Sequence, residues 1–439
     1  MTWASAVSQL AAIEAGDVSP SELRDQGIER CERLDPQLGF LATDLFDRAP
    51  SGIPMLLKDA GQEIAGTPHW VGVAALRDAG CRSMSTTPLP ERFEHAGFSI
   101  IGKSACPPLS NGVTTEPPGF APTRNPWDVG MSVGGSSGGA AAAVACGAVP
   151  IAHGSDATGS LRFPAALCGV ATLVPTAGTI ESVAPAGQPP SPWWRDFVLA
   201  RDARDLELML GLLAPESSPA PVVARQRRAS VLDHDPELGM VVEPECRQAV
   251  RTVAALLEDL GWVVDERWPP ALDSLWQRVG AALGVVSDAT RPPVFEWVAG
   301  RLGRRLTEDE LPAEVFAAAA RDAGRSTEDR SKAGATIEAV VAPIADWFRE
   351  VDVLITPATF QAGWPLGIEP GVTQCGTLAA PFSLSGHPSV VVPVPLTPGR
   401  APVGVQIVGR HGSDGALLRL LIELQDCFDW LAHRPDIFA

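Results

Sequence analysis

The alternation of apolar and polar positions predicts a chain in which helices and short buried strands follow one another. Residues 5–15 have the spacing of a surface helix, and a capping box at residues 19–22 begins a second helix that runs to about Arg33. A third helix over residues 91–97 leads into the apolar run 98–101, which has the composition of a strand. This alternation is typical of an α/β core.

The second half of the chain continues the pattern. Residues 244–260 place Val250 and Val253 on one face, which predicts an amphipathic helix, and residues 268–347 predict helices rich in alanine and arginine. Three apolar runs predict buried strands: residues 351–356, 389–394 and 403–408. Residues 414–426 predict a final helix. Because strand-forming runs lie in both halves, we expect the two ends of the chain to join one sheet.

The most distinctive stretch begins with a Gly/Ser turn at residues 134–139 and continues as an alanine-rich helix. Small residues let such a helix pack close to neighbouring backbone. The apolar run 149–152 predicts a buried strand, followed by a small-residue loop at 155–160 and a helix that starts near Pro164. Ser160 is therefore expected at a strand-to-helix corner, close to backbone N–H groups and to the positive end of a helix dipole.

This position of Ser160 suits an acyl-transfer nucleophile, because the oxyanion that forms during attack needs fixed N–H donors. A serine at a helix start is also a common helix cap, so the residues alone leave both interpretations open. A nucleophile needs a base, and histidine is the usual one. His153 is the only histidine in this stretch, and its place on an apolar strand predicts a packing role.

Lysine supplies an alternative base. Lysine occurs only at positions 58, 103 and 332, although the chain has 34 basic residues. Arginine does not lose its proton in proteins, whereas burial can lower the pKa of a lysine enough for it to act as a base. Lys58 ends an apolar run and is expected in a desolvated site. Lys103 also ends an apolar strand and is its rival, while Lys332 is expected on a solvated helix face.

Three segments resemble the amidase signature enzymes, which are serine hydrolases with a Ser-Ser-Lys triad. They are Lys58-Asp59, the turn 134–139 and residues 156–164, and the similarity extends over most of the chain. The resemblance implies an α/β fold with a central mixed, twisted β-sheet covered by helices on both faces. It also implies that Ser160 is the nucleophile, that Ser136 is a middle serine after a cis peptide bond, and that Lys58 is the base.

The resemblance further implies a set of residues around the nucleophile. The backbone N–H groups of Ala157, Thr158 and Gly159 would form the oxyanion hole. The supporting loop would consist of Gly134, Gly135, Ser137, Asp156 and Arg162, of which Asp156 and Arg162 are expected to form a structural ion pair. The family usually has two glycines before the nucleophile, and here the first is Thr158, whose β-branched side chain limits backbone freedom.

Composition restricts the functional classes. With 45% hydrophobic and 20% charged residues, the 439-residue chain can bury a large core. A net charge of −18 argues against a nucleic-acid partner, and no apolar run reaches membrane-spanning length. The start of the chain lacks the positive n-region expected of a signal peptide. The eight cysteines include no Cys-x-x-Cys pair, so their spacing indicates neither a zinc site nor a disulfide framework. A cytoplasmic, bacterial-type monomer or homodimer is expected, with no cofactor and no metal.

We expect one amidase-type domain over residues 1–439. Its N-terminal helices occupy residues 1–60, and the resemblance implies that the more variable helical region, residues 190–346, lies near the substrate entrance. His69 and His387 have no acidic partner at a spacing that would orient them, so both are interpreted as packing residues, as is Cys375.

The predicted function is the hydrolysis of a small-molecule amide C–N bond through an acyl-enzyme on Ser160. Three alternatives stay open. The same triad would cleave carbamates or esters, a similar chain could be an amidotransferase-type subunit, and a protein of this fold could be a catalytically silent binding protein.

Overall fold

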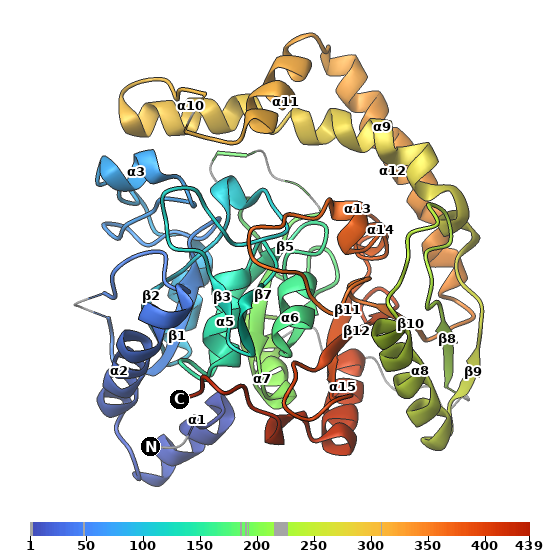
Figure 1. Ribbon diagram of the computed structural model, residues 1–439, viewed down its shortest axis with the longest axis horizontal. Helices are drawn as coiled ribbons and strands as arrows, with labels where there is room; N and C mark the ends of the chain where they lie inside the picture. Colours follow the sequence, from blue (N-terminus) through green and yellow to red (C-terminus); the bar gives the residue numbers. More distant parts are fainter. Residues whose placement is uncertain are drawn as a thin grey trace.

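One mixed β-sheet forms the centre of the molecule (Figure 1). The computed structural model describes residues 3–46, 49–184, 187–188, 191, 193–214, 227–308 and 310–439. Across these residues the sheet has ten strands in the order β2-β1-β5-β7-β6-β11-β12-β10-β8-β9. They are β1 (Ile53–Lys58), β2 (Phe98–Ser104), β5 (Ile151–Asp156), β6 (Ala171–Val174), β7 (Arg195–Ala200), β8 (Arg228–Val231), β9 (Val263–Asp265), β10 (Val353–Pro357), β11 (Ser389–Val394) and β12 (Val403–Gly409).

The strand directions confirm a mixed sheet. Strand β1 pairs in parallel with β2 and with β5, and the pairs from β5 through β7, β6, β11 and β12 to β10 are antiparallel. The last pairs, β10 with β8 and β8 with β9, are parallel again. Every residue of β1, β2, β5 and β12 is buried, including the polar residues at the ends of β1, β2 and β5, among them Lys58, Lys103 and Asp156.

Helices cover both faces of this sheet, as two glycines of strand β12 show. A Cβ on Gly404 would overlap Ala166 of α6 (Arg162–Cys168), whereas one on Gly409 would overlap Leu417 of α15 (Asp414–Phe428). Positions that differ by an odd number along a strand point to opposite faces, so α6 and α15 lie on opposite sides. The other core helices are α1 (Ala6–Ala15), α2 (Pro20–Leu38), α4 (Pro88–His95), α5 (Gly138–Ala145), α7 (Ala203–Leu213) and α8 (Pro244–Asp259).

Four helices form an arch along one side of the molecule, above the sheet in Figure 1. They are α9 (Leu275–Asp288), α10 (Arg291–Leu302), α11 (Ala313–Ala323) and α12 (Thr327–Trp347). Val294 and Val298 of α10 pack with Val71 and Leu76 in a separate buried cluster, and Leu76 belongs to α3 (Ala74–Asp78). This contact fixes the far end of the arch on the segment that follows β1.

The helices and strands predicted from the sequence are present, with shifted ends. Helix α2 continues to Leu38 rather than Arg33, although Pro36 lies inside it. Strand β5 runs to Asp156, so Ser155 and Asp156 belong to the strand and not to the expected loop, because β7 pairs with it along its whole length.

The remaining short elements are β3 (Arg124–Asn125), β4 (Asp128–Ser132), α13 (Val372–Cys375), α14 (Ala380–Leu384), and the 3-10 turns η1 (Pro108–Ser110), η2 (Pro270–Ser274) and η3 (Trp430–Ala432). Cys375, expected in a loop, ends α13. Within the described ranges, no helix is long and apolar enough to cross a membrane.

The contact between Gly404 and α6 gives a stability prediction. Gly404→Val should lower the free energy of unfolding by about 1–3 kcal/mol, because the new side chain overlaps Ala166, including its backbone Cα. The matched control is Gly280→Ala in α9, where a Cβ meets nothing within 4 Å. This control should be neutral or gain up to about 1 kcal/mol. Thermal unfolding of both variants measures the difference, and an unchanged melting temperature for Gly404→Val would show that α6 is not held as described.

Candidate active site

The amine of Lys58 lies at the end of β1, in the middle of the molecule, and the side chain is fully buried. Its Nζ donates to three hydroxyl groups: Ser136 Oγ at 2.8 Å, Ser137 Oγ at 3.0 Å and Ser155 Oγ at 3.0 Å. The indole ring of Trp194 lies on another side, with its centroid 6.0 Å from Nζ. Among the described residues, no carboxylate forms an ion pair with this amine.

Burial lowers the pKa of Lys58 from 10.5 to about 8, and the charges of Asp196 and Asp156 offset only part of this effect. A substantial fraction of the side chain is therefore neutral in mildly alkaline solution. A neutral amine 2.8 Å from a serine hydroxyl has the geometry of a general base.

The turn that carries Ser136 depends on its glycines. The peptide bond between Gly135 and Ser136 is cis, as the resemblance implied. A Cβ on Gly135 would come within 2.6 Å of the carbonyl oxygen of Thr114, and one on Gly139 would overlap the backbone of Ala105. Only glycine allows the backbone segments to approach so closely, which explains the Gly/Ser composition of the turn.

Ser160 follows β5 and precedes α6, at the corner expected from the sequence. Its side chain is half-buried, and its carbonyl oxygen accepts a hydrogen bond from the N–H of Ser137 at 3.1 Å. The loop that carries Ser160 and the serine turn are therefore in direct contact. The structure brings Lys58, Ser136 and Ser160 to one place.

The loop before Ser160 corrects one expectation. The N–H of Gly159 donates to Asp156 Oδ1 at 2.8 Å, so of the three expected oxyanion donors this one has a side-chain partner. Gly159 has φ +135°, and the ring of Phe163 occupies the space where a Cβ would lie. The N–H groups of Ala157 and Thr158 have no partner in the part of the chain that the structure describes.

Arg162 holds this loop to the C-terminal third of the chain. Its buried guanidinium donates to both carboxylate oxygens of Asp156, at 2.8 and 3.0 Å, and the expected ion pair is present. It also donates to the carbonyl oxygen of Ala379, to Gln406 Oε1 and to Ser383 Oγ. Burial alone raises the pKa of Asp156, but the charge and hydrogen bonds of Arg162 bring it down to about 2.

His153 has the packing role expected, within a hydrogen-bonded chain. Its Nδ1 lies 3.4 Å from the backbone nitrogen of Lys58, and its Nε2 lies 3.3 Å from Asp196 Oδ1. His387 stacks between Phe348 and His411 and does not contact Ser136 or Ser160. Cys375 packs in a buried cluster with Phe163 and Trp364.

The expectation that His69 lacks an acidic partner is wrong. His69 Nδ1 lies 3.2 Å from Asp59 Oδ1 and 2.8 Å from Lys103 Nζ, and all three side chains are buried. Lys103 also lies 3.4 Å from Asp59 Oδ1 and contacts none of the three serines, so the geometry favours Lys58 as the base. Ser155 and this cluster were not predicted from the sequence. Lys103 lies 44 positions after Asp59 and meets it through the pairing of β1 with β2, and Ser155 meets Lys58 through the pairing of β1 with β5.

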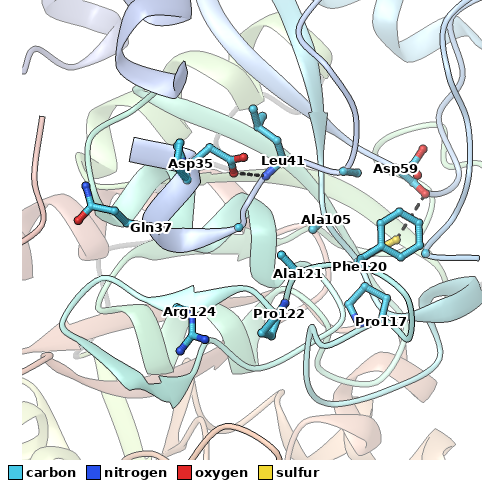
Figure 2. A pocket seen from close by; sticks show the side chains of 15 residues that line it. Asp35, Gln37, Leu41, Asp59, Ala105, Pro117, Phe120, Ala121, Pro122 and Arg124 are labelled. Carbon is cyan, nitrogen blue, oxygen red and sulfur yellow. Dashed lines mark hydrogen bonds between the residues drawn. The ribbon is translucent and has the colours of Figure 1, made fainter. Parts of the chain in front are cut away.

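A cavity of about 360 Å³ lies beside this cluster, between the C-terminal end of α2 and residues 117–124. Figure 2 shows Asp35 and Leu41 on one side of it and Phe120 and Pro117 on the other. Asp59 also lines it, and Ser136 and Ser160 do not. The cavity is therefore separate from the serine turn.

Comparison with known proteins places this geometry in a family. The family model described as Amidase matches residues 47–418. The chain belongs to the amidase family. Its sequence is 30% identical to a 6-aminohexanoate-cyclic-dimer hydrolase of Paenarthrobacter ureafaciens, over 99% of this chain and 97% of the relative. It is 27% identical to an acylamidase of Rhodococcus erythropolis, over 99% and 97%.

The fold agrees with this assignment. A solved structure of a 6-aminohexanoate cyclic dimer hydrolase complexed with substrate superposes with a TM-score of 0.89 at 28% identity, over 100% of this chain and 99% of that one. The amidase signature resemblance and the α/β fold are thereby confirmed. The protein is an amidase, a hydrolase of amide C–N bonds.

The loop anchored by Arg162 gives the second prediction. Arg162→Met leaves Asp156 as a buried, unpaired carboxylate and should cost about 3–5 kcal/mol of stability. Arg162→Lys keeps the charge but loses the planar set of donors, so hydrolysis should fall more than tenfold even where the protein folds. The exposed pair of Arg204 with Asp426 is the control, and Arg204→Lys should change stability by less than about 1 kcal/mol. Urea unfolding measures the change in stability, and initial rates measure the change in hydrolysis. Full activity in Arg162→Lys would contradict a requirement for the guanidinium group in this loop.

Proposed function

We propose that the amidase cleaves a small-molecule amide through an acyl-enzyme on Ser160. Neutral Lys58 takes a proton from Ser136, and Ser136 takes the proton of Ser160 as its Oγ attacks the carbonyl carbon. The C–N bond breaks, and the amine leaves with the proton that returns through Ser136. Water then attacks the acyl-serine by the same relay and releases the acid.

The developing oxyanion needs donors beside Ser160. We assign this role to the N–H groups of Ala157 and Thr158, whose hydrogens have no other described partner. Asp156 holds Gly159 through its N–H, and this fixes the loop so that its donors keep one geometry. The side chain of Thr158 is half-buried and leaves the backbone donor in place.

One observation carries the proposal. The Lys58 amine is fully buried, donates only to serine hydroxyls and has a pKa of about 8. A lysine that serves only as a structural cation in a protein interior is expected to have a carboxylate partner, as Lys103 does. His153 does not replace it, since its ring faces Asp196 and the backbone of Lys58.

The substrate class is proposed from the relatives. Two curated relatives are named for a cyclic dimer of 6-aminohexanoate, and a third is named acylamidase. We therefore propose small neutral amides, cyclic or acylated, as substrates of a cytoplasmic monomer or homodimer. Residues 1–439 would act as one domain, with the helical region 190–346 near the substrate entrance.

A panel of matched amides, carbamates and esters tests the scissile bond, since the same relay activates serine toward any of these carbonyls. Co-purification of a second chain would instead indicate an amidotransferase-type subunit. A protein that hydrolyses nothing in the panel and does not react with a fluorophosphonate would be a silent binding protein.

The nucleophile is tested by Ser160→Ala. Hydrolysis should fall to background while the melting temperature stays within a few degrees of wild type, because a half-buried hydroxyl at a loop corner adds little to the core. A fluorophosphonate should label the wild type at Ser160 and leave the variant unlabelled, as peptide mass analysis would show. Residual turnover above a few per cent would place the nucleophile elsewhere.

The base is tested by Lys58→Arg, which keeps a positive charge but cannot lose its proton. Its rate should fall by about 10²–10⁴-fold, as far as that of Lys58→Met. The wild-type rate should rise with pH through about 8 and level off above it, because the deprotonated amine is the active form. Lys332→Arg is the matched control, since Lys332 is exposed and pairs with Glu328. A Lys58→Arg enzyme with more than a tenth of the normal rate would show that Lys58 acts only through its charge.

A further inference from the structure

Two of the three lysines in the chain are buried on neighbouring strands. In the pairing of β1 with β2, Leu57 lies opposite Lys103 and Lys58 lies opposite Ser104. Successive residues of a strand point to opposite faces, so Lys58 and Lys103 leave the sheet on different sides. Both ammonium groups lose their hydration, and burial lowers the pKa of both. The different surroundings of the two amines therefore decide which of them keeps its proton.

The partners of the two amines differ in kind. Lys58 Nζ has three neutral hydroxyls around it. Lys103 Nζ has the carboxylate of Asp59 at 3.4 Å and the Nδ1 of His69 at 2.8 Å. A carboxylate and a nitrogen lone pair both stabilise an ammonium group more than hydroxyls do.

Asp59 is the residue directly after Lys58, and its polar groups are engaged. Its N–H donates to the carbonyl oxygen of Ser104 at 3.0 Å, and its own carbonyl oxygen accepts from Cys106 Sγ at 3.4 Å. Its carboxylate accepts from the N–H of Trp70 at 3.1 Å and from Lys103 Nζ at 3.4 Å. These bonds fix the backbone at the end of β1.

His69 completes the cluster as a neutral ring. Because the Lys103 ammonium donates to Nδ1, the ring proton is assigned to Nε2, which faces Glu63 Oε1 at 3.6 Å. Burial, and after it the charge of Lys103, lowers the pKa of His69 and keeps the ring neutral. Glu63 pairs with Arg301 of α10 at 3.3 Å, and Trp297 of the same helix packs edge-on against the His69 ring.

We propose that Asp59 and His69 are positioning residues that hold Lys103 as an ammonium ion, and that this fixed charge pair beside Lys58 selects Lys58 as the lysine that loses its proton. The proposal rests on the proposed function, in which Lys58 is the base. The two charges of the pair act on the Lys58 ammonium in opposite directions. Lys103 disfavours it by repulsion, and Asp59 favours it by attraction.

Other charged groups around the two amines complete the field. Asp196 and Asp156 act on Lys58, and Glu63 acts with Asp59 on Lys103, whereas burial raises the pKa of Cys106 to about 12 and leaves it a neutral thiol. Apart from Asp59, none of these groups changes in the experiment below, so a shift in the behaviour of Lys58 can be attributed to the substituted residue.

The experiment measures the rate at which a fluorophosphonate labels Ser160 as a function of pH, which needs no knowledge of the natural substrate. Lys103→Met leaves the Asp59 charge unopposed, and the midpoint of the profile should move up by roughly 0.5–1 pH unit. Asp59→Asn removes the negative charge, and the midpoint should move down by a similar amount. The double variant removes both charges and should return the midpoint to the wild-type value. A purely structural role would not produce shifts of opposite sign that cancel.

A second pair of variants leaves both charged residues in place. His69→Leu removes the acceptor for Lys103, which weakens its ammonium form, so the midpoint should move up. His69→Gln restores an acceptor and should restore the midpoint. His387→Leu replaces another buried histidine that contacts neither lysine, and its midpoint should equal that of the wild type.

The outcomes separate the two proposals. A wild-type protein that is not labelled at Ser160 contradicts the proposed function. Normal labelling with an unchanged midpoint in Lys103→Met and His69→Leu overturns the role of the cluster, as does a double variant that fails to return to the wild-type midpoint. If the variants of Asp59 and Lys103 do not fold, the comparison of His69→Leu with His69→Gln decides the question, and equal midpoints in that pair count against the proposal.

Discussion

The burial of the Lys58 amine without a carboxylate partner is the constraint on which the rest of the site depends. An amine in the interior of a protein is destabilised as an ion, and here the surroundings offer hydroxyl groups instead of a counter-charge. The serine turn must therefore approach the end of β1 closely enough to place three hydroxyls around one nitrogen. This approach in turn requires glycine at positions 135 and 139, where any side chain would overlap the neighbouring backbone.

The charged side chains near this amine form ion pairs with each other and not with Lys58. Asp156 is paired with Arg162, and Asp59 is paired with Lys103. These two carboxylates therefore contribute little net attraction for a proton on Lys58. Asp196 is occupied by His153, Gln62 and the N–H of Val183. The site therefore contains many ionisable groups but little uncompensated negative charge, so burial can lower the pKa of Lys58 to about 8.

The core elements and the Gly/Ser turn could be predicted from the sequence, for different reasons. The buried strands were predictable because they are apolar runs, and the helices because one apolar face repeats at helical spacing. The Gly/Ser turn was predictable because only glycine allows its close backbone contacts. The role of Gly159 could not be predicted, because its N–H is taken by a side chain three residues earlier, and nothing in the composition of the loop distinguishes a donor that faces Asp156 from one that faces a substrate. The contact of His69 with Asp59 and Lys103 depends on the register of β1 against β2, which apolar runs do not specify.

The partners of Arg162 also determine when this protein can become active. The guanidinium that orders the nucleophile loop is bound by Ala379, Ser383 and Gln406, which lie more than 200 residues after Ser160 in the chain. A ribosome-bound chain that has already exposed Ser160, Ser136 and Lys58 still lacks these acceptors, and its loop arginine has only Asp156 to bind. In the proposed function, the fold thus delays the assembly of a reactive serine until β12 has been synthesised and inserted between β10 and β11.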